Sequence, residues 1–160
     1  KNLYDFRYKK RHEYTELLKT VYEYAAVGVA EYEMIIGNVM RRTLETFSTF
    51  IYRKGIDTIS CDEDILASLG RDEYKVYFQN LMYRLVLNGE SHMEERTRTI
   101  VDADFFSVLS SAEKQRTAKD IICFLYLLNP NHIKAHLNDI DDAVTNITTW
   151  CSDILSFNQR

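Results

Sequence analysis

Turn-forming residues are scarce in this sequence, which has one proline and five glycines among 160 residues. Tight hairpin turns depend on these residues, so the composition argues against an all-β fold and favours helices. The sequence also lacks any apolar run near the roughly 20 residues that a membrane-spanning helix needs. We therefore expect an all-α protein that is soluble and cytoplasmic and has no membrane partner.

Cysteine is scarce as well, and its spacing excludes two classes of small fold. Cys61, Cys123 and Cys151 are odd in number and far apart, which argues against a disulfide framework and against a zinc ribbon. We expect reduced, mostly buried thiols. The net charge of -4 provides no overall basic field for a polyanion, so contact with nucleic acid would require a local basic patch. The total charge neither supports nor excludes such a patch.

Glycine-rich phosphate-binding loops are absent from the sequence. It contains neither Gly-x-x-x-x-Gly-Lys-Ser/Thr nor Gly-x-Gly-x-x-Gly, so the backbone nest that cradles phosphates in nucleotide-binding proteins is missing. We recognise no complete active site and expect no cofactor in this segment. Whether the chain is an enzyme stays open at this point.

Apolar residues instead recur every three or four positions, as on the buried face of a helix. The pattern predicts helices over about residues 12–26, 31–53, 60–69, the stretch between Gly70 and Asn88, 110–128, 130–136 and 141–157. Residues 91–101 are only weakly patterned. We expect one helical domain over residues 1–160, a bundle of about five to seven helices. The apolar stretch Ile121–Leu128 suits a central helix.

Local signals mark several helix starts. Serine followed three residues later by glutamate has capping-box spacing, and this occurs at Ser60 and Glu63, at Ser91 and Glu94, and at Ser110 and Glu113. Asn129-Pro130 predicts an N-cap with proline at the first helical position. We therefore expect a helix to restart after Asn129.

Several of the predicted helices carry apolar residues at coiled-coil spacing. The sets include Ile36, Met40, Thr43, Phe47 and Phe50; Tyr74, Phe78, Leu81 and Leu85; and Ile140, Val144, Ile147, Cys151 and Ile154. Such seams pack lengthwise on a neighbouring helix, either of the same chain or of a second copy. Beside the first seam, Glu45 follows Arg41 by four residues and Arg42 by three, spacings that allow ion pairs within a helix.

Two histidines have a spacing found in metal sites. His132 and His136 stand four apart, which on a helix turns both imidazoles to one side and supplies half of a metal site. No glutamate follows His132 directly, as a zincin motif requires. The alternative is that the pair serves packing or capping.

A second pair of residues resembles a nuclease motif. Arg7 and His12 fit the Arg-x-x-x-x-His spacing of the helical HEPN ribonucleases, in which the arginine stabilises phosphate and the histidine helps proton transfer. In that family the motif belongs inside a core helix, whereas here it lies in a basic segment at a helix entrance. The alternative is a solvated basic segment or a phosphate-contacting arm.

Three segments together resemble one particular family. They are Asn38–Phe47, with the string Met-Arg-Arg-x-Leu-Glu-x-Phe, then Arg84–His92, and then Asn129–His132. They are similar to the C-terminal region of bacterial AAA-family ATPases with an ABC/SMC-like head that act in anti-phage defence. Members include the ATPases of anticodon-nuclease, Septu-type and retron-associated systems. The resemblance runs from about Tyr14 to Leu137.

The resemblance implies where the catalytic chemistry would lie. In that family the Walker motifs, the signature sequence and the switch histidine are N-terminal to this region, so ATP and Mg²⁺ would be bound by a head outside it. The chain begins at Lys1 rather than methionine, and no signal peptide follows, so we expect a cut from a longer chain. The resemblance implies that this chain is the C-terminal piece of an ATPase. The implied role is a helical element that transmits nucleotide state or docks an effector.

The resemblance also directs attention to particular side chains. The candidates for contacting phosphate or a partner carboxylate are Arg41, Arg42, Glu45, Ser91 and His92. Expected partners are the ATPase head of the same chain, an effector nuclease or a second copy. Two alternatives stay open: a self-contained HEPN-like ribonuclease, and a non-catalytic adaptor that binds protein.

Overall fold

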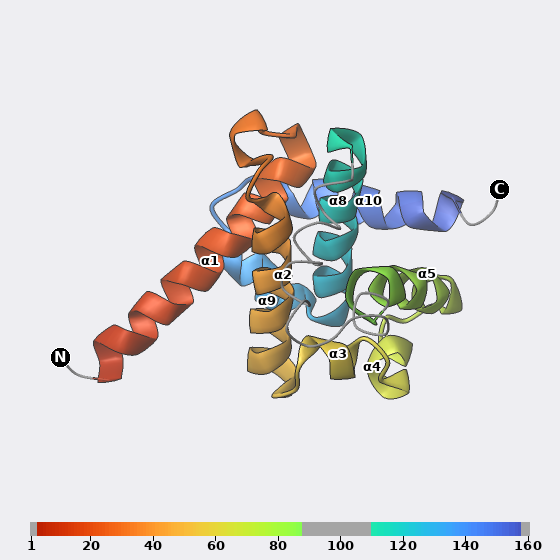
Figure 1. Ribbon diagram of the computed structural model, residues 1–160, viewed down its shortest axis with the longest axis horizontal. Coiled ribbons are helices and arrows are strands. Elements are labelled where there is room, and N and C mark those ends of the chain that lie inside the picture. The colour runs from red at the N-terminus through yellow and green to blue at the C-terminus, as the bar shows by residue number, and fades with distance from the viewer. Residues whose placement is uncertain (1–2, 88–109, 158–160) are drawn as a thin grey trace.

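The structure, a computed structural model, describes the backbone of residues 3–87 and 110–157 and the side chains of residues 12–86 and 110–156 (Figure 1). All regular structure in these ranges is helical, which confirms the all-α prediction. The α-helices are α1 (Leu3–Val27), α2 (Ile36–Phe47), α3 (Ile56–Ile59), α4 (Glu63–Ala67), α5 (Asp72–Met82), α8 (Ser111–Leu128), α9 (Pro130–His136) and α10 (Ala143–Phe157). Three short helices join them: the 3₁₀ helix η1 (Ala30–Tyr32) and the π-helices η2 (Ser48–Tyr52) and η3 (Tyr83–Leu87).

The helices pack into a bundle in which α8 contacts α1, α2, α9 and α10. Within α8 the residues Asp120–Leu125 are buried without interruption. α1 packs along α2 and α8, and its first turns extend away from the other helices (Figure 1). In the described ranges, no helix combines the length and apolarity that crossing a lipid bilayer requires.

Two of the predicted helix starts are confirmed. The Ser110 hydroxyl accepts a 3.2 Å hydrogen bond from the Glu113 backbone N–H, and the Glu113 carboxylate accepts a 2.8 Å bond from the Ser110 N–H. This is the expected capping box. At the start of α9, the Asn129 side chain accepts a bond from the His132 N–H, and Pro130 occupies the first helical position.

The predicted capping box at Ser60 is wrong. The N-cap of α4 is Asp62, whose carboxylate accepts hydrogen bonds from the backbone N–H groups of Asp64 and Ile65. The Ser60 hydroxyl, at the C-cap of α3, instead donates a hydrogen bond to the carbonyl of Ile56, the first residue of that helix. A carboxylate directly before the helix accepts hydrogen bonds from two free N–H groups and faces the positive end of the helix dipole. Asp62 is therefore the N-cap instead of Ser60. The expected Ser91 box lies outside the described residues.

The helix predicted over residues 31–53 is divided into three pieces, η1, α2 and η2. Gly28 ends α1 with a φ of +70°, and the chain then turns toward the start of α8. There the Glu33 carboxylate accepts hydrogen bonds from Tyr24 Oη at 2.6 Å and Ser111 Oγ at 2.8 Å, and it pairs with Lys114. Between η1 and α2 the backbone forms three-residue turns, with Glu33 N–H bonded to Ala30 O and Ile35 N–H to Tyr32 O, and α2 begins only at Ile36.

The seam of α2 is confirmed up to Phe47 and fails at Phe50. Ile36, Met40, Thr43 and Phe47 are each fully buried, whereas Phe50 is 52% exposed. Phe50 lies in the π-helix η2, whose wider turn contains more residues than an α-helical turn. The extra residue rotates Phe50 away from the core.

The seam of α10 is displaced by one residue at its start. Ile147, Cys151 and Ile154 are buried as predicted, but the first buried residue is Ala143, and Val144 is 39% exposed. Ala143, Ile147 and Cys151 are spaced four residues apart, so they lie on one face of the helix just as the predicted residues would. The small Ala143 packs closely against the core, and Val144 is partly exposed.

One buried carboxylate sits beside the apolar part of α8. Asp120 is only 7% exposed and accepts a 2.7 Å hydrogen bond from Tyr77 Oη on α5. Burial raises the pKa of Asp120 to about 6, and the Tyr77 bond and the positive charges of Arg116 and Arg84 oppose that rise. Folding therefore favours the protonated form of this group.

Candidate functional site

The α2 segment that carries the family resemblance has a buried apolar face and an exposed charged face. Met40, Leu44 and Phe47 are buried in the core, at 0%, 4% and 0% exposure. Arg42 and Glu45 are exposed. The apolar half of the motif therefore maintains the fold, and the charged half is available to other molecules.

The two arginines of this motif differ in their surroundings. Arg41 Nε lies 3.1 Å from Glu45 Oε1, so the predicted ion pair four residues apart is formed. Arg42, three residues from Glu45, makes no ion pair or hydrogen bond within the part of the chain that the structure describes. Its guanidinium donors remain available for an external carboxylate or phosphate.

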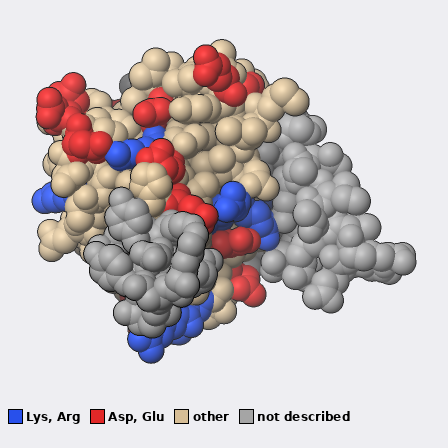
Figure 2. Space-filling model, turned by 90° about the vertical axis from the view of Figure 1, so that its left-hand side faces the viewer, with Lys and Arg blue, Asp and Glu red and all other residues tan. Residues whose placement is uncertain are grey.

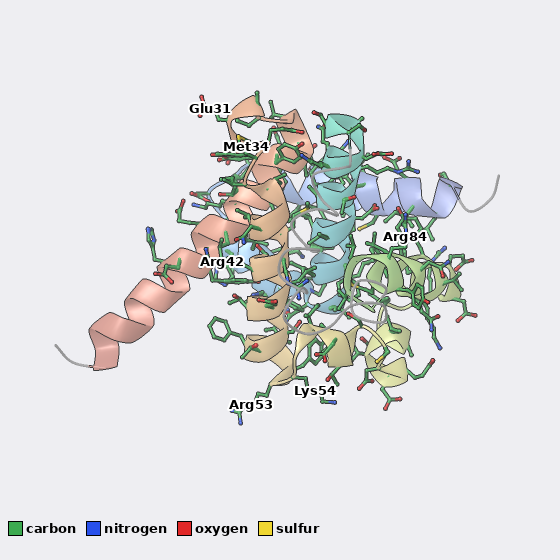
Figure 3. The ribbon with its side chains drawn as sticks, in the orientation of Figure 1. Glu31, Met34, Arg42, Arg53, Lys54 and Arg84 are labelled. Atoms are coloured by element: carbon green, nitrogen blue, oxygen red, sulfur yellow. The ribbon has the colours of Figure 1, made fainter. Side chains whose placement is uncertain are left out.

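Arg42 and Glu45 line an open hollow of about 270 Å³ between α1 and the end of α2, which we call the α1–α2 groove. Figure 3 shows Arg42 on the side of α2 nearest α1. The residues that line the groove are Glu13, Tyr14 and Leu17 from α1, and Arg42, Glu45, Thr46, Thr49 and Phe50 from α2 and η2. The π-helical turn that removes Phe50 from the core thus places it in this groove.

Charges of both signs surround the groove rather than a single basic patch. Its lining includes one guanidinium, from Arg42, and two carboxylates, from Glu13 and Glu45. Across the face drawn in Figure 2, acidic and basic side chains of the described residues also occur together. Such a mixed rim suits a protein surface better than a nucleic-acid backbone, whose binding needs accumulated positive charge.

The two histidines of α9 form hydrogen bonds with the α1 residues at the floor of the groove. Tyr14 is 2% exposed, and a 3.0 Å hydrogen bond joins its Oη to His132 Nε2. His136 Nδ1 lies 2.7 Å from Thr15 Oγ1, and the two imidazole rings are 4.6 Å apart. Burial, helped by the neighbouring His136, lowers the pKa of His132 to about 4, so its ring is neutral at pH 7.

This arrangement bears directly on the metal hypothesis. His132 and His136 do lie side by side, but each uses a ring nitrogen to bind a hydroxyl of α1. Among the described residues, no group of three or more histidine, cysteine, aspartate or glutamate side chains is placed to hold a metal ion. The contacts correspond to the packing alternative and position Tyr14 at the groove.

The nuclease pair is not brought together by the backbone. Positions 7 and 12 both lie in the continuous helix α1, where five residues correspond to a rotation of about 140° around the axis. The two positions therefore lie on different sides of the helix. His12 is exposed, and the side chain of Arg7 is outside the described set.

Two of the three resemblance segments meet in space. The ring of Phe47, from the first segment, packs against the ring of His132, from the third, with centroids 5.6 Å apart. Arg84, at the start of the second segment, is exposed on η3. Ser91 and His92 lie outside the described residues.

No family model, no curated protein and no solved structure matches this chain.

One groove residue was expected elsewhere: the sequence pattern placed Phe50 in the buried seam of α2, and it lies in the groove instead. One local signal was present: Ser48-Thr49 directly before Phe50 interrupts the apolar face near the end of the helix. The approach of α1 to this helix end is a tertiary contact with no local signature.

Proposed function

We propose that this chain is the helical C-terminal region of an anti-phage defence ATPase with an ABC/SMC-like head, and that it docks an effector protein in the α1–α2 groove. One observation carries the proposal. The segment that resembles this family forms one wall of the groove, and its charged residues, Arg42 and Glu45, line that wall. ATP and Mg²⁺ belong to the head, outside this segment.

The groove has the chemistry of a site for a protein side chain. Phe50 is a half-exposed aromatic next to Arg42, and aromatic residues and arginine contribute most often to binding hot spots. Because Arg41 pairs with Glu45, the groove charges that have no ion pair among the described residues are the guanidinium of Arg42 and the carboxylate of Glu13. The occupant is an amphipathic helix of the effector, with an apolar anchor over Phe50 flanked by one acidic and one basic residue.

α1 provides a physical connection between a head and the groove. It runs for 25 residues, about 37 Å, as one continuous helix. Its first turns extend from the bundle (Figure 1), while Glu13, Tyr14 and Leu17, farther along the same helix, line the groove. A head that displaces the extended turns therefore moves one wall of the groove, which changes its fit to the effector.

The test uses the full-length gene product in a phage-infection assay. Arg42→Ala and Phe50→Ala should each reduce effector co-purification and phage protection by about tenfold or more, because both remove groove contacts. ATP hydrolysis should stay within about twofold of wild type, since these residues lie outside the head. Arg53→Ala is the matched control, because Arg53 is an exposed arginine at the end of η2 and does not line the groove.

Each result decides part of the proposal. Wild-type protection by both groove variants would refute the docking role. A gene product without a Walker A loop would refute the ATPase assignment, and groove-dependent binding in such a protein would favour the adaptor alternative instead.

A further inference from the structure

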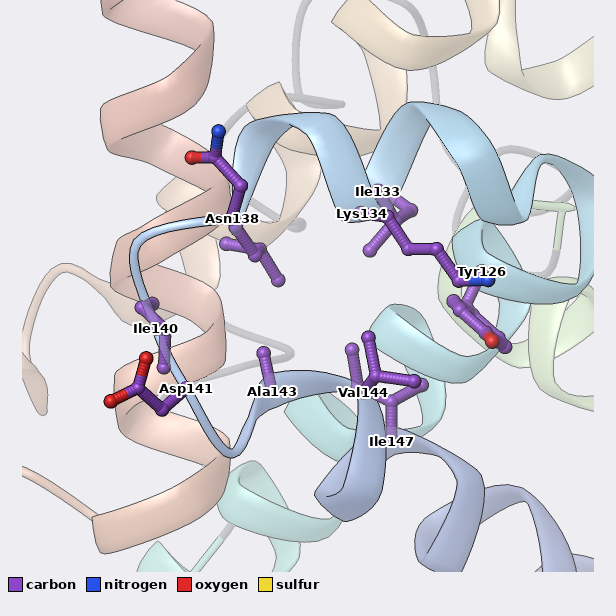
Figure 4. Close-up of a pocket in the computed structure, with 10 residues that line it drawn as sticks. Tyr126, Ile133, Lys134, Asn138, Ile140, Asp141, Ala143, Val144 and Ile147 are labelled. Atoms are coloured by element: carbon purple, nitrogen blue, oxygen red, sulfur yellow. The ribbon is translucent and has the colours of Figure 1, made fainter.

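A second hollow lies at the opposite end of α9 from its cap. The last turn of α8, helix α9 and the first turns of α10 enclose about 210 Å³, which we call the α9–α10 pocket (Figure 4). Its apolar lining consists of Ile133, Leu137, Ile140, Ala143, Val144 and Ile147. Its polar lining consists of Tyr126, Lys134, Asn138 and Asp141.

The displaced seam of α10 contributes one wall of the pocket. With Ala143 turned to the core, Val144 faces the pocket and remains 39% exposed. Ile133, Leu137 and Ile147 are buried at 1–2% and close the floor. Apolar walls that have no packing partner on one side lose dispersion contacts, so an apolar occupant is favoured over water.

The polar groups are separated between the two ends of the pocket. Figure 4 shows Lys134 and Tyr126 at one end, and Asn138 and Asp141 at the other. Neither the Lys134 ammonium nor the Tyr126 hydroxyl has a hydrogen bond or ion pair within the described ranges. One end therefore offers unused hydrogen-bond donors and a positive charge, and the other offers a negative charge.

We propose that the α9–α10 pocket binds a small monocarboxylate with a single ring or a branched alkyl body. The carboxylate accepts hydrogen bonds from Lys134 Nζ and Tyr126 Oη, and the body lies against Val144 and the buried isoleucines. Asp141 repels a carboxylate from the other end and so fixes the orientation of the ligand. An apolar cavity of about 150 Å³ holds benzene, so the volume here suits one ring with a short acidic side chain.

The test titrates the folded chain with phenylacetate and follows backbone amides by NMR. Saturable shifts should be confined to residues lining the pocket, with an affinity in roughly the millimolar range for so small a ligand. Phenylacetamide, which has the same shape without the charge, should bind about tenfold more weakly. Lys134→Gln and Tyr126→Phe should weaken phenylacetate binding, whereas Lys54→Gln, a lysine outside the pocket, should leave it unchanged.

A blocking variant makes the outcome decisive. Val144→Trp adds bulk at a partly exposed lining position, so it should fill the pocket and abolish binding without disturbing the core. The absence of saturable shifts would overturn the proposal, as would equal affinity for phenylacetamide. Binding that survives Val144→Trp would locate the ligand elsewhere and overturn it too.

Discussion

Replacement of Asp120 by asparagine should stabilise the protein at neutral pH. Asp120 is 7% exposed, and its pKa is about 6 in the folded state against 3.8 ordinarily. That difference corresponds to about 3 kcal/mol of folding free energy. Because the folded-state pKa is raised, the contribution of Asp120 to the stability of the folded state is fully present below pH 3.8. It is lost as the pH rises through about 6. An asparagine has no charge to bury, and its amide oxygen can still accept the hydrogen bond from the Tyr77 hydroxyl.

The assay is urea unfolding of wild type and Asp120→Asn near pH 4 and at pH 7.5, followed by circular dichroism. The variant should gain up to about 3 kcal/mol at pH 7.5 and almost nothing near pH 4. Other carboxylates titrate in both proteins, Glu33 and Asp62 with a lowered pKa among them, so they cancel in the difference.

Tyr77→Phe is the control for the hydrogen bond. It keeps the carboxylate and removes its donor, which should destabilise the protein and raise the pKa of Asp120 further, since the bond opposes the rise. An equal gain for Asp120→Asn at both pH values, or a loss at pH 7.5, would refute the reasoning.

Three further predictions concern α1 and the residues that contact it. In an NMR titration, His132 should stay neutral down to a midpoint near pH 4. Because its folded-state pKa is lowered, its contribution to the free energy of unfolding should be lost as the pH falls from about 6.5 through 4. A midpoint above about pH 6 would contradict the burial argument. Tyr14→Phe should cost about 1–3 kcal/mol in urea unfolding, because it leaves the His132 ring nitrogen without its partner; no loss would show that the bond is replaced by water. Any RNA cleavage by the isolated chain should be unaffected by Arg7→Ala or His12→Ala, since positions 7 and 12 lie on different sides of α1. Loss of cleavage in both variants would support the ribonuclease hypothesis.

The sequence predicted the α2 side of the candidate site but not the α1 side. The spacing of Arg41 and Glu45 was sufficient to predict their ion pair, because helical geometry alone brings them together. Arg42 and Glu45 were named from the family resemblance, and both line the groove. The opposite wall, with Glu13 and Tyr14, was not predictable in the same way, since it depends on where a distant segment crosses α2.

The sequence by itself determined that this chain is helical, where most helices lie and which caps begin α8 and α9, because periodicity and capping are interactions between near neighbours. The tertiary structure alone decided the position of Phe50 and of Val144. Both satisfy the apolar repeat, and both were expected in the core. A π-helical turn in one case and the closer packing of Ala143 in the other moved them to the surface. Local sequence sets the period of a helix, but its packing partners decide which of two adjacent residues faces inward, and here that choice opened the groove and the pocket.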